Sequence, residues 1–513
     1  MQITYIGHAG LYLDSECGSI LCDPWFNSAY LASWFPYPSN KNIDIESISK
    51  PNYLYISHLH LDHFDPAFLK KYISKQATVL LPEFGTSHMR DALSDLGFKY
   101  FIDTKNGEDM VLDGGYRVMV NSLSSPTDGP LGDSVLAVDD GVAKVLNQND
   151  ARPTNLALLN NFGVYDAHFL QFSGAIWFPM VYRYDKNLKD RLARAKRKNQ
   201  LERACQYVKA IGAKNVFPSA GPPCFLDESL FELNDFSDPS SLNGSETNIF
   251  CDARVFIGHL LENGIENSHL IGPNSKIKIG KEYLDIDSPE DLRNAYEKKR
   301  QYLVSYQEQV APQIEAEKKL WPKLRSGEMF QIMKEWFEPL IKSAPLTCRG
   351  INGRILLSSS NGEFVLDFLT QEVEPYEGQS CRFRFYFQDG VMEYCLANRV
   401  EDWVNMAFLS CRFEAEREGP YNEYVYSFFK SLSEMRMEFV ENYYSRDTPV
   451  GETIECEGYK IQRYCPHLRA DLTEFGYVEN GVLTCKLHGW RFDLDSGKCL
   501  TSQDRKLFSE PID

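Results

Sequence analysis

The stretch YLYISHLHLDHFDP, residues 53–66, decides the fold, because a β-rich run leads directly into three histidines and two aspartates. A strand that ends in a loop at this spacing can turn the side chains of His58, His60, Asp62 and His63 toward one point. Imidazoles packed this closely desolvate one another without gain unless they bind a metal ion. We therefore expect a metal centre at the end of this strand; the alternative is a polar loop with incidental histidines.

Strand-like and helix-like runs alternate on both sides of this stretch. The β-rich runs are QITYIGHAGLYL (2–13), GSILCDPWF (18–26), ATVLLPE (77–83), YRVMVNSLSS (116–125), DSVLAVDDG (133–141), AKVLNQND (143–150), YDAHFLQFSGA (165–175) and NVFPSAGP (215–222). Helical spacing of apolar residues occurs in residues 66–75, 87–97 and 188–213. This mixed order predicts an α/β domain over residues 1–275.

The remainder of the chain divides into three parts. A helical segment is expected over residues 285–343 and a small α/β module over residues 344–445. In that module GRILLSSS (353–360), EFVLDFL (363–369), CRFRFYFQDG (381–390) and MEYCLANR (392–399) are predicted strands, with a helical close at 424–444. Short strands and turns predict a compact β domain over residues 452–513.

Composition excludes several classes of function. A net charge of −18 argues against nucleic-acid or anionic-membrane binding, because such surfaces are normally basic. No apolar run is long enough to span a bilayer, and the first residues lack the pattern of a signal peptide, so we expect a cytoplasmic protein without a membrane partner. Most of the 13 cysteines are irregularly spaced, which is typical of small buried hydrophobes in a reducing compartment.

Cys465 and Cys485 are exceptions to this irregular spacing, because each is closely followed by a histidine. Cys465-Pro-His467 is followed after 17 residues by Cys485-Lys-Leu-His488. Two thiolates and two imidazoles can hold zinc, or a Rieske [2Fe–2S] cluster with the cysteines on one iron and the histidines on the other. The tight Cys-x-His spacing favours the cluster, and the segment resembles the Rieske domains of oxygenases and ferredoxins. Ala470 and Leu487 stand where high-potential Rieske proteins have disulfide cysteines, which implies the lower-potential, oxygenase type.

The N-terminal region resembles the metallo-β-lactamase fold, whose signature is His-x-His-x-Asp-His. The likeness includes YIGHAGLYLDSECGSILCDPWF (5–26) and the strand pair that ends in NQND (147–150). The resemblance implies an αββα fold with His58 and His60 at one metal position and Asp62 and His63 at the other. It further implies that Asp150 bridges the two metals. His8 and Asp23 are expected to support the ligands rather than to bind metal.

The sequence departs from the metallo-β-lactamase pattern at two histidine positions. Residues 64–149 contain one histidine, His88, in a predicted helix, so Ser125, Asp128 or Asp133 is a candidate replacement for the missing ligand. Ser219 stands where a later histidine is expected. His168 is interpreted as a buried strand residue, and His259 and His269 as ordinary. A centre with fewer imidazoles and more oxygen ligands suits non-haem iron, with one or two ions.

The two sites together suggest an electron path, because inserting one oxygen atom of O₂ into a substrate needs two external electrons. The combination resembles the cytidine-monophosphate N-acetylneuraminate hydroxylases. The likeness is strongest in residues 20–38, 53–72, 145–153 and 168–182. In the animal hydroxylases the Rieske part lies near the N-terminus, whereas here it is C-terminal.

The leading hypothesis is therefore a Rieske-coupled non-haem iron monooxygenase that acts on a small polar substrate, a nucleotide sugar or an amine-containing metabolite. Electrons are expected from a separate ferredoxin, flavin reductase or cytochrome, because no Gly-rich dinucleotide motif is present. Arg152 is a candidate for pairing with a substrate phosphate or carboxylate, with an internal salt bridge as the alternative. The alternative functions are a zinc hydrolase with a redox-regulatory Rieske domain and a non-enzymatic electron carrier. A homo-oligomer is considered, although no sequence feature indicates it.

Overall fold

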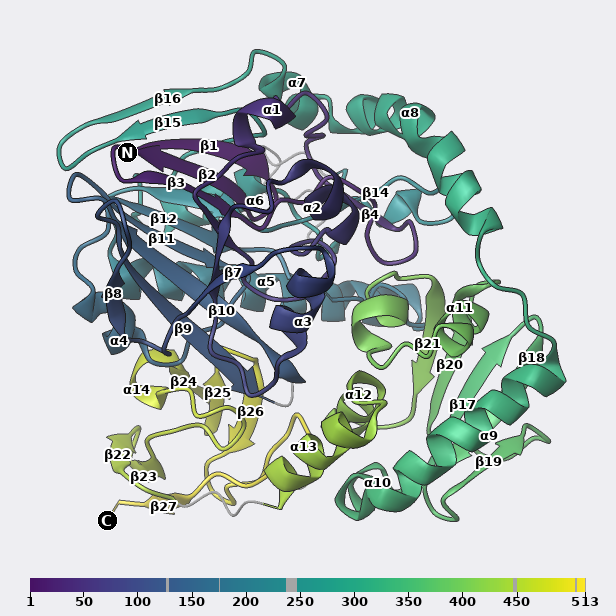
Figure 1. Ribbon diagram of the computed structural model, residues 1–513. Coiled ribbons are helices and arrows are strands. Elements are labelled where there is room, and N and C mark those ends of the chain that lie inside the picture. The colour runs from purple at the N-terminus through teal and green to yellow at the C-terminus, as the bar shows by residue number, and fades with distance from the viewer. Residues whose placement is uncertain (126–128, 175, 237–246, 446–449, 503–504, 513) are drawn as a thin grey trace. The chain divides into compact units, whose positions relative to one another are not determined.

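The computed structural model describes residues 1–125, 129–174, 176–236, 247–445, 450–502 and 505–512. These form two compact units, which are described separately. The first comprises residues 1–124, 130–176 and 187–317, and the second comprises residues 125–129, 177–186 and 318–513. Figure 1 labels the helices and strands of both units. No helix in these described ranges is long and apolar enough to cross a membrane.

The first unit is built around two β-sheets. The eight-stranded sheet has the order β16-β15-β1-β2-β3-β5-β6-β7, with antiparallel pairing among the first five strands and parallel pairing from β3 to β7. Its strands are β1 (Gln2–Gly7), β2 (Gly10–Ser15), β3 (Gly18–Cys22), β5 (Tyr53–Tyr55), β6 (Thr78–Leu81), β7 (Tyr100–Asp103), β15 (Lys276–Ile279) and β16 (Leu284–Asp287). Because β15 pairs with β1, the sheet continues past residue 275.

The second sheet has six strands in the order β13-β12-β11-β10-β9-β8. They are β8 (Asp109–Val111), β9 (Arg117–Ser125), β10 (Gly129–Asp139), β11 (Lys144–Asn149), β12 (Ala167–Gln171) and β13 (Val216–Ser219). β11, β12 and β13 run parallel, so their carboxyl ends meet at one edge. A small separate pair joins β4 (Trp34–Phe35) to β14 (Cys224–Phe225).

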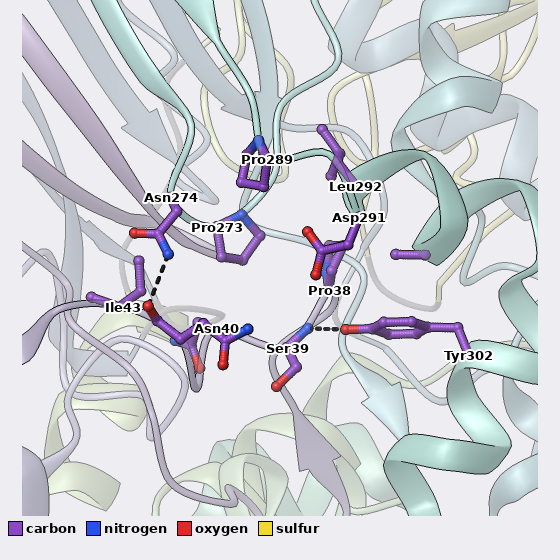
Figure 2. Close-up of a pocket in the computed structure, with 12 residues that line it drawn as sticks. Pro38, Ser39, Asn40, Ile43, Pro273, Asn274, Pro289, Asp291, Leu292 and Tyr302 are labelled. Carbon is purple, nitrogen blue, oxygen red and sulfur yellow. Dashed lines mark hydrogen bonds between the residues drawn. The ribbon is translucent and has the colours of Figure 1, made fainter.

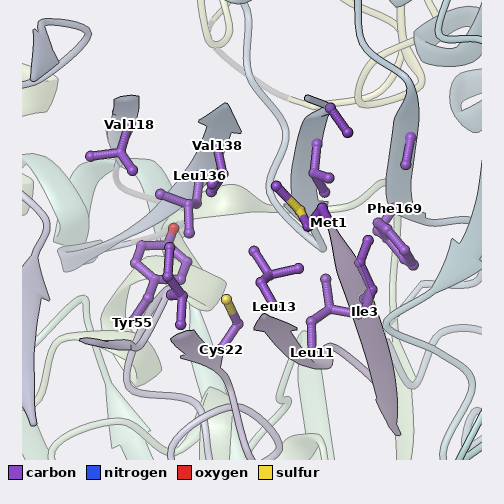
Figure 3. Close-up of a cluster of buried hydrophobic side chains, with 14 of the residues drawn as sticks. Met1, Ile3, Leu11, Leu13, Cys22, Tyr55, Val118, Leu136, Val138 and Phe169 are labelled. Carbon is purple, nitrogen blue, oxygen red and sulfur yellow. The ribbon is translucent and has the colours of Figure 1, made fainter. Parts of the chain in front are cut away.

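The core of this unit lies between the two sheets, as Figure 3 shows. Ile3, Leu11 and Leu13 of the first sheet are buried in the same cluster as Leu136 and Phe169 of the second. Alternate residues of each strand supply this layer, which is the expected consequence of the two-residue side-chain period of a strand. Burial of apolar area at about 25 cal/mol per Å² makes this layer the main stabilising contribution to the unit.

Helices cover the outer faces of the two sheets, which gives the predicted αββα arrangement (Figure 1). Phe68 of α2 and Leu93 of α3 pack with Leu54 of β5 on the first sheet, and Phe256 of α6 stacks on Phe172, which follows β12 of the second. The helices of the unit are α1 (Ile45–Ile48), α2 (Pro66–Tyr72), α3 (His88–Asp95), α4 (Leu156–Asn161), α5 (Lys186–Ile211), η1 (Phe231–Leu233), α6 (Ala253–Glu262), α7 (Leu292–Glu297) and α8 (Lys299–Lys319).

The second unit contains a five-stranded sheet of order β19-β18-β17-β20-β21. Its elements are α9 (Ser326–Ser343), α10 (Pro345–Ile351), β17 (Arg354–Ser359), β18 (Gly362–Asp367), β19 (Glu372–Pro375), β20 (Phe383–Phe387), α11 (Val391–Ala397), η2 (Val404–Phe408), β21 (Phe413–Arg417), α12 (Glu423–Lys430) and α13 (Glu434–Tyr444). The helical region expected over 285–343 thus comprises α7, α8 and α9, and the unit boundary falls within it.

One predicted strand of this module is wrong. Residues 392–399 form most of helix α11 instead. Val391, Met392, Cys395 and Leu396 are buried, which is the three-to-four-residue spacing of a helix face rather than the alternation of a strand. The strands predicted at 353–360, 363–369 and 381–390 are confirmed as β17, β18 and β20, and the helical close is confirmed as α12 and α13.

The C-terminal part of the second unit is β-rich, as predicted. One three-stranded sheet joins β22 (Thr453–Cys456), β23 (Tyr459–Gln462) and β27 (Ser509–Pro511). The other joins β24 (Gly476–Glu479), β25 (Val482–Cys485) and β26 (Trp490–Asp493), and the short helix α14 (Leu472–Phe475) precedes it. The two Cys/His motifs lie in the loops that follow β23 and β25.

Candidate metal centre

The histidine-rich loop of the first unit lies between strand β5 and helix α2. Asp65 closes this loop, because its carboxylate accepts hydrogen bonds from the backbone N–H groups of Phe68 at 2.9 Å and Phe26 at 3.0 Å. Asp65 is the N-cap of α2 and Pro66 occupies its first turn, so the sequence specifies where the helix begins. The loop residues between β5 and α2 are consequently held at the end of the sheet.

One group of side chains able to hold a metal ion consists of His58, His60 and Asp150. One ligand atom of each lies within 4.8 Å of the others. The rings of His58 and His60 have centroids 4.2 Å apart. Asp150 follows β11 of the second sheet, and its Oδ1 lies 3.9 Å from Nε2 of His58. The structure therefore brings together three predicted site residues from two different sheets.

A second such group consists of His8, Asp62 and His63, all buried. Nε2 of His8 lies 2.9 Å from Oδ2 of Asp62. Nε2 of His63 lies 3.7 Å from the same oxygen and 3.6 Å from Oδ1 of Asp150. Asp150 thus lies beside both groups, at the place expected for a bridging residue. His8, to which the sequence analysis gave only a supporting role, joins the candidate ligands.

Asp23 and Ser57 support the histidines from behind. The Asp23 carboxylate accepts hydrogen bonds from the N–H and the hydroxyl of Ser57, both at 2.7 Å, and lies 3.0 Å from Nδ1 of His63. The same hydroxyl lies 2.9 Å from Nδ1 of His58 and 3.2 Å from Nδ1 of His63. A carboxylate on Nδ1 leaves Nε2 as the metal-binding nitrogen, so Asp23 has the supporting geometry predicted for it.

Tyr30 is a site residue that the sequence analysis missed. Its hydroxyl donates a hydrogen bond of 2.5 Å to Oδ1 of Asp62. Tyr30 is buried at 1% exposure and has a positive φ of 51°, so the backbone is held in an uncommon conformation there. It lies in the aromatic-rich stretch 20–38, where most rings are core residues and no local pattern distinguishes it.

The charge balance of the centre fits a bound cation. Nε2 of His63 and Oδ1 of Asp150 are buried and make no hydrogen bond among the described residues. Burial acts to lower the pKa of His63, but the neighbouring carboxylates of Asp150 and Asp62 outweigh it and raise that pKa to about 10. Burial acts to raise the pKa of Asp62, but His63 and His8 hold it well below its usual value. The buried carboxylates of Asp62 and Asp150 are therefore stabilised by a nearby positive charge, and a bound metal ion would supply it.

The residues expected at the positions of the missing histidines lie in different places in the structure. Oδ1 of Asp133 lies 3.3 Å from Nδ1 of His58, whereas Asp150 lies nearer to Nε2 of the same ring. Asp128 and the side chain of Ser125 lie outside the described residues. Ser219 lies at the end of β13, and its buried hydroxyl has no hydrogen-bond partner among the described residues. His168 is fully buried in β12, as predicted, where Nε2 pairs with Gln148 at 2.9 Å.

Figure 2 shows a cavity of the first unit whose lining includes none of the candidate metal ligands. It is lined by Pro38, Ser39, Asn274, Asp291 and Tyr302, among others, and Ser39 N–H donates to the Tyr302 hydroxyl at 2.9 Å. Its volume of about 70 Å³ accommodates a few water molecules. It is too small for a metabolite, and none of the predicted site residues lines it.

The C-terminal motifs arrange their ligands in like pairs. Cys465 and Cys485 are buried, and the hydrogen bond from Cys465 lowers the pKa of the Cys485 thiol, so the two sulfur atoms are neighbours. The rings of His467 and His488 have centroids 4.9 Å apart at an interplanar angle of 87°, and Trp490 stacks on His467 at 4.0 Å. Two adjacent thiols beside two adjacent imidazoles match the two ends of a Rieske cluster.

Residues outside the β domain contact these loops within the second unit. The hydroxyl of Tyr443, in α13, donates a hydrogen bond of 2.7 Å to the backbone carbonyl of His467. Arg505 forms an ion pair at 3.0 Å with Glu423 of α12, whose side chain is 5% exposed. Both contacts join α12–α13 to the β domain, and neither was predicted from the sequence.

Comparison with known families assigns residues 329–508. Residues 329–446 match a family model described as an Rv3818-like, SCP2-like domain. Residues 446–508 match the Rieske [2Fe-2S] domain. The second match confirms the predicted Rieske domain and its cofactor.

Three individual proteins extend the comparison. A "Putative Rieske 2Fe-2S iron-sulfur protein" of Mycolicibacterium smegmatis is 41% identical over 521 residues, which cover 99% of both chains. The cytidine monophosphate-N-acetylneuraminic acid hydroxylase of Macaca mulatta is 24% identical over 326 residues, 58% of this chain and 52% of that protein, which confirms the predicted resemblance. Among solved structures, the diiron β-hydroxylase CmlA from Streptomyces venezuelae matches with a TM-score of 0.36 and 15% identity over 54% of each chain.

Proposed function

This chain belongs to the family of Rieske 2Fe-2S iron–sulfur proteins that contain an Rv3818-like, SCP2-like domain, and on that premise we propose that it is an O₂-dependent monooxygenase. Non-haem iron at the N-terminal groups would provide oxygen activation, and the Rieske cluster would provide electrons one at a time. The substrate would be a small polar metabolite, a nucleotide sugar or an amine-containing compound. The product would be hydroxylated at carbon or oxygenated at nitrogen.

The observation that supports this proposal best is the composition of the two metal-binding groups. His58, His60 and Asp150 form one set of two histidines and one carboxylate, and the second group repeats that composition. Two histidines with one carboxylate leave coordination positions open and are typical of non-haem Fe(II) oxygenases. A hydrolytic zinc centre has no need for the electrons that a Rieske domain transfers.

The protein's own residues would hold this centre in a fixed geometry. Asp23 orients the His63 ring through Nδ1, and Tyr30 and His8 fix the two oxygens of Asp62. Burial of these groups excludes bulk water and strengthens their electrostatic interactions. Asp150, half-buried at the end of β11, is the candidate ligand contributed by the second sheet.

Electrons would come from a separate protein. Hydroxylation by O₂ consumes two electrons and two protons and releases one oxygen atom as water, so the cluster must be reduced twice in each turnover. A ferredoxin, flavin reductase or cytochrome would perform this reduction, since the sequence has no Gly-rich dinucleotide motif. Turnover with NAD(P)H by the purified protein alone would contradict this part of the proposal.

The decisive experiment is metal analysis with EPR on anaerobically purified protein. We expect about three or four irons per chain in the wild type and about two in His58→Ala, with the EPR signal of the reduced Rieske cluster retained, since the two sites use different ligands. His259→Ala is the matched control, because His259 lies in α6 and belongs to neither metal-binding group.

The metal content also separates the alternatives. Two irons with one or two zinc ions would contradict the oxygenase and favour a zinc hydrolase that cleaves its substrate without O₂. Two irons with no metal at the N-terminal groups would favour an electron carrier. If iron is found, oxygen-dependent product formation from nucleotide sugars and amines identifies the substrate class.

A further inference from the structure

One face of helix α5 presents a line of polar side chains to the end of the second sheet. Lys196, Gln200, Arg203 and Tyr207 are spaced by four, three and four residues, so they share one side of the helix. The Tyr207 hydroxyl donates to the carbonyl of Pro153 at 2.9 Å, which places this face against the segment that follows β11. Arg152 precedes Pro153 and therefore belongs to the same region.

The loop after β12 borders the same face. A Cβ atom at Gly174 would lie 2.4 Å from Nε2 of Gln200, so the Gln200 amide lies directly against this glycine. The absence of a side chain at Gly174 leaves room for that amide. The four residues Arg152, Lys196, Gln200 and Arg203, called here the α5 cationic cluster, thus lie near the carboxyl ends of β11 and β12.

The cations of this cluster have no counter-charge among the described residues. The titratable groups that act on Lys196 are Arg152 and Arg203, and those that act on Arg203 are Arg152, which lowers its pKa, and the Tyr207 hydroxyl, which raises it; none of them is a carboxylate. Burial lowers the pKa of Lys196 to about 7 and that of Arg203 to about 9, and repulsion from Arg152 adds to both shifts. Arg203 is only 7% exposed. Unpaired buried cations are costly and are usually retained where an anion binds.

The neighbouring cations of α5 behave differently. Arg197 pairs with Asp235 at 3.0 Å, and Lys198 lies 3.7 Å from Glu202. Among the described residues, the helix therefore has carboxylate partners on its other sides but not on the face of the α5 cationic cluster.

Gln200 gives independent evidence for a ligand. It is 1% exposed, and neither Nε2 nor Oε1 has a hydrogen-bond partner among the described residues. A buried amide without partners is destabilising, and a bound ligand with an acceptor oxygen would recover part of that loss. Gln200 lies between Lys196 and Arg203 on the helix face, so its Nε2 donor lies among the cations.

We propose that Arg152, Lys196, Gln200 and Arg203 form a binding site for the phosphate group of the substrate. Phosphate fits better than carboxylate, because a monoester has a charge of about −1.5 to −2 and three acceptor oxygens, whereas one carboxylate would leave more of the three positive charges uncompensated. Asp150 lies two residues before Arg152, so a phosphate held here would anchor a metabolite beside the metal centre. The assignment of this phosphate to the substrate rests on the proposed function; the anion site itself does not.

The test uses full-length protein and inorganic phosphate in isothermal titration calorimetry, with chloride added to keep the ionic strength constant. We expect one phosphate per chain, with binding at least about tenfold weaker in Arg203→Gln and in Lys196→Gln, since each loses a charge-assisted hydrogen bond. Lys198→Gln on the same helix is the matched control and should bind as the wild type does. Gly174→Ala should also weaken binding, because the added methyl displaces Gln200.

Several results would overturn the proposal. These are absence of phosphate binding to the wild type, equal binding by Arg203→Gln and Lys196→Gln, or acetate binding as tightly as phosphate. His58→Ala separates this site from the metal centre: it should lose iron but retain phosphate binding. Loss of phosphate together with iron would show that the anion binds the metal. Phosphate binding in a protein that contains no N-terminal iron would instead leave the anion site established and refute the oxygenase.

Discussion

Replacement of Asp23 by asparagine tests whether the hydrogen bond between Asp23 and Nδ1 of His63 keeps the His63 ring in the form that binds a metal ion. The substitution keeps the size of the side chain, and one amide oxygen can still accept the Ser57 N–H bond of 2.7 Å. The other carboxylate oxygen becomes an NH₂ group, which is a donor facing Nδ1 of His63. Nδ1 must then be an acceptor, so the ring proton moves to Nε2, the nitrogen that a metal requires unprotonated.

The expected magnitude follows from this tautomer change. Loss of such an outer hydrogen-bond partner lowers metal affinity by roughly 10–100-fold, which corresponds to about 1.4–2.7 kcal/mol. The free energy of unfolding of the metal-free protein should fall by only about 1 kcal/mol, because the buried Ser57 N–H keeps its acceptor. The effect is thus larger on metal binding than on folding.

Iron retention during titration with a chelator measures the first quantity, and urea unfolding of the metal-free protein measures the second. Asp95→Asn is the control, because Asp95 is exposed at the end of α3. If Asp23→Asn kept wild-type iron affinity, the assignment of Nε2 of His63 as a metal-binding atom would be refuted. If unfolding stability fell as much as metal affinity, Asp23 would have a general structural role instead.

Three further predictions concern other parts of the chain. Tyr443→Phe removes the hydrogen bond to the His467 carbonyl and should lower the Rieske reduction potential by about 20–60 mV in a redox titration, with the cluster content unchanged; an unchanged potential would contradict it. Arg505→Met leaves Glu423 without its ion-pair partner and should cost about 3 kcal/mol in chemical unfolding, whereas the double variant with Glu423→Gln should lose clearly less; equal losses would contradict the pairing. Burial lowers the pKa of His168 from 6.5 to about 3, so protonation of the unfolded state should reduce stability as the pH falls from about 6.5, by about 2.7 kcal/mol at pH 4.5; His168→Gln should lack this loss.

The parts of the site that are local in sequence were predictable. His58, His60, Asp62 and His63 lie in one loop, so their spacing alone indicates convergence. Asp150 was assigned from the resemblance of the strand pair ending in NQND to the metallo-β-lactamase fold, and in the structure it lies 3.9 Å from His58 and 3.6 Å from His63.

The missed features depend on contacts between distant segments. His8 reaches Asp62 across 54 positions and Tyr30 reaches it across 32, and neither residue has a local signal that separates a ligand contact from core packing. Residues 392–399 were predicted as a strand because apolar and polar residues are mixed there, and packing within the module selected the helix. Of the α5 cationic cluster, the sequence indicated Arg152 alone. The other members lie on a helix, and the sequence did not show which side of that helix contacts the second sheet.

The hydroxyl of Ser57 makes the two metal-binding groups interdependent. A hydroxyl has one proton, and here it is donated to Asp23, so the oxygen can accept from Nδ1 of His58 and shares with Asp23 the acceptance from Nδ1 of His63. One proton arrangement therefore sets the tautomer of a histidine in each group. An ion that selects this arrangement at one position prepares the other without any movement of the backbone, so the centre would fill with positive cooperativity. Protein with a metal ion in one group and none in the other would then be the disfavoured state.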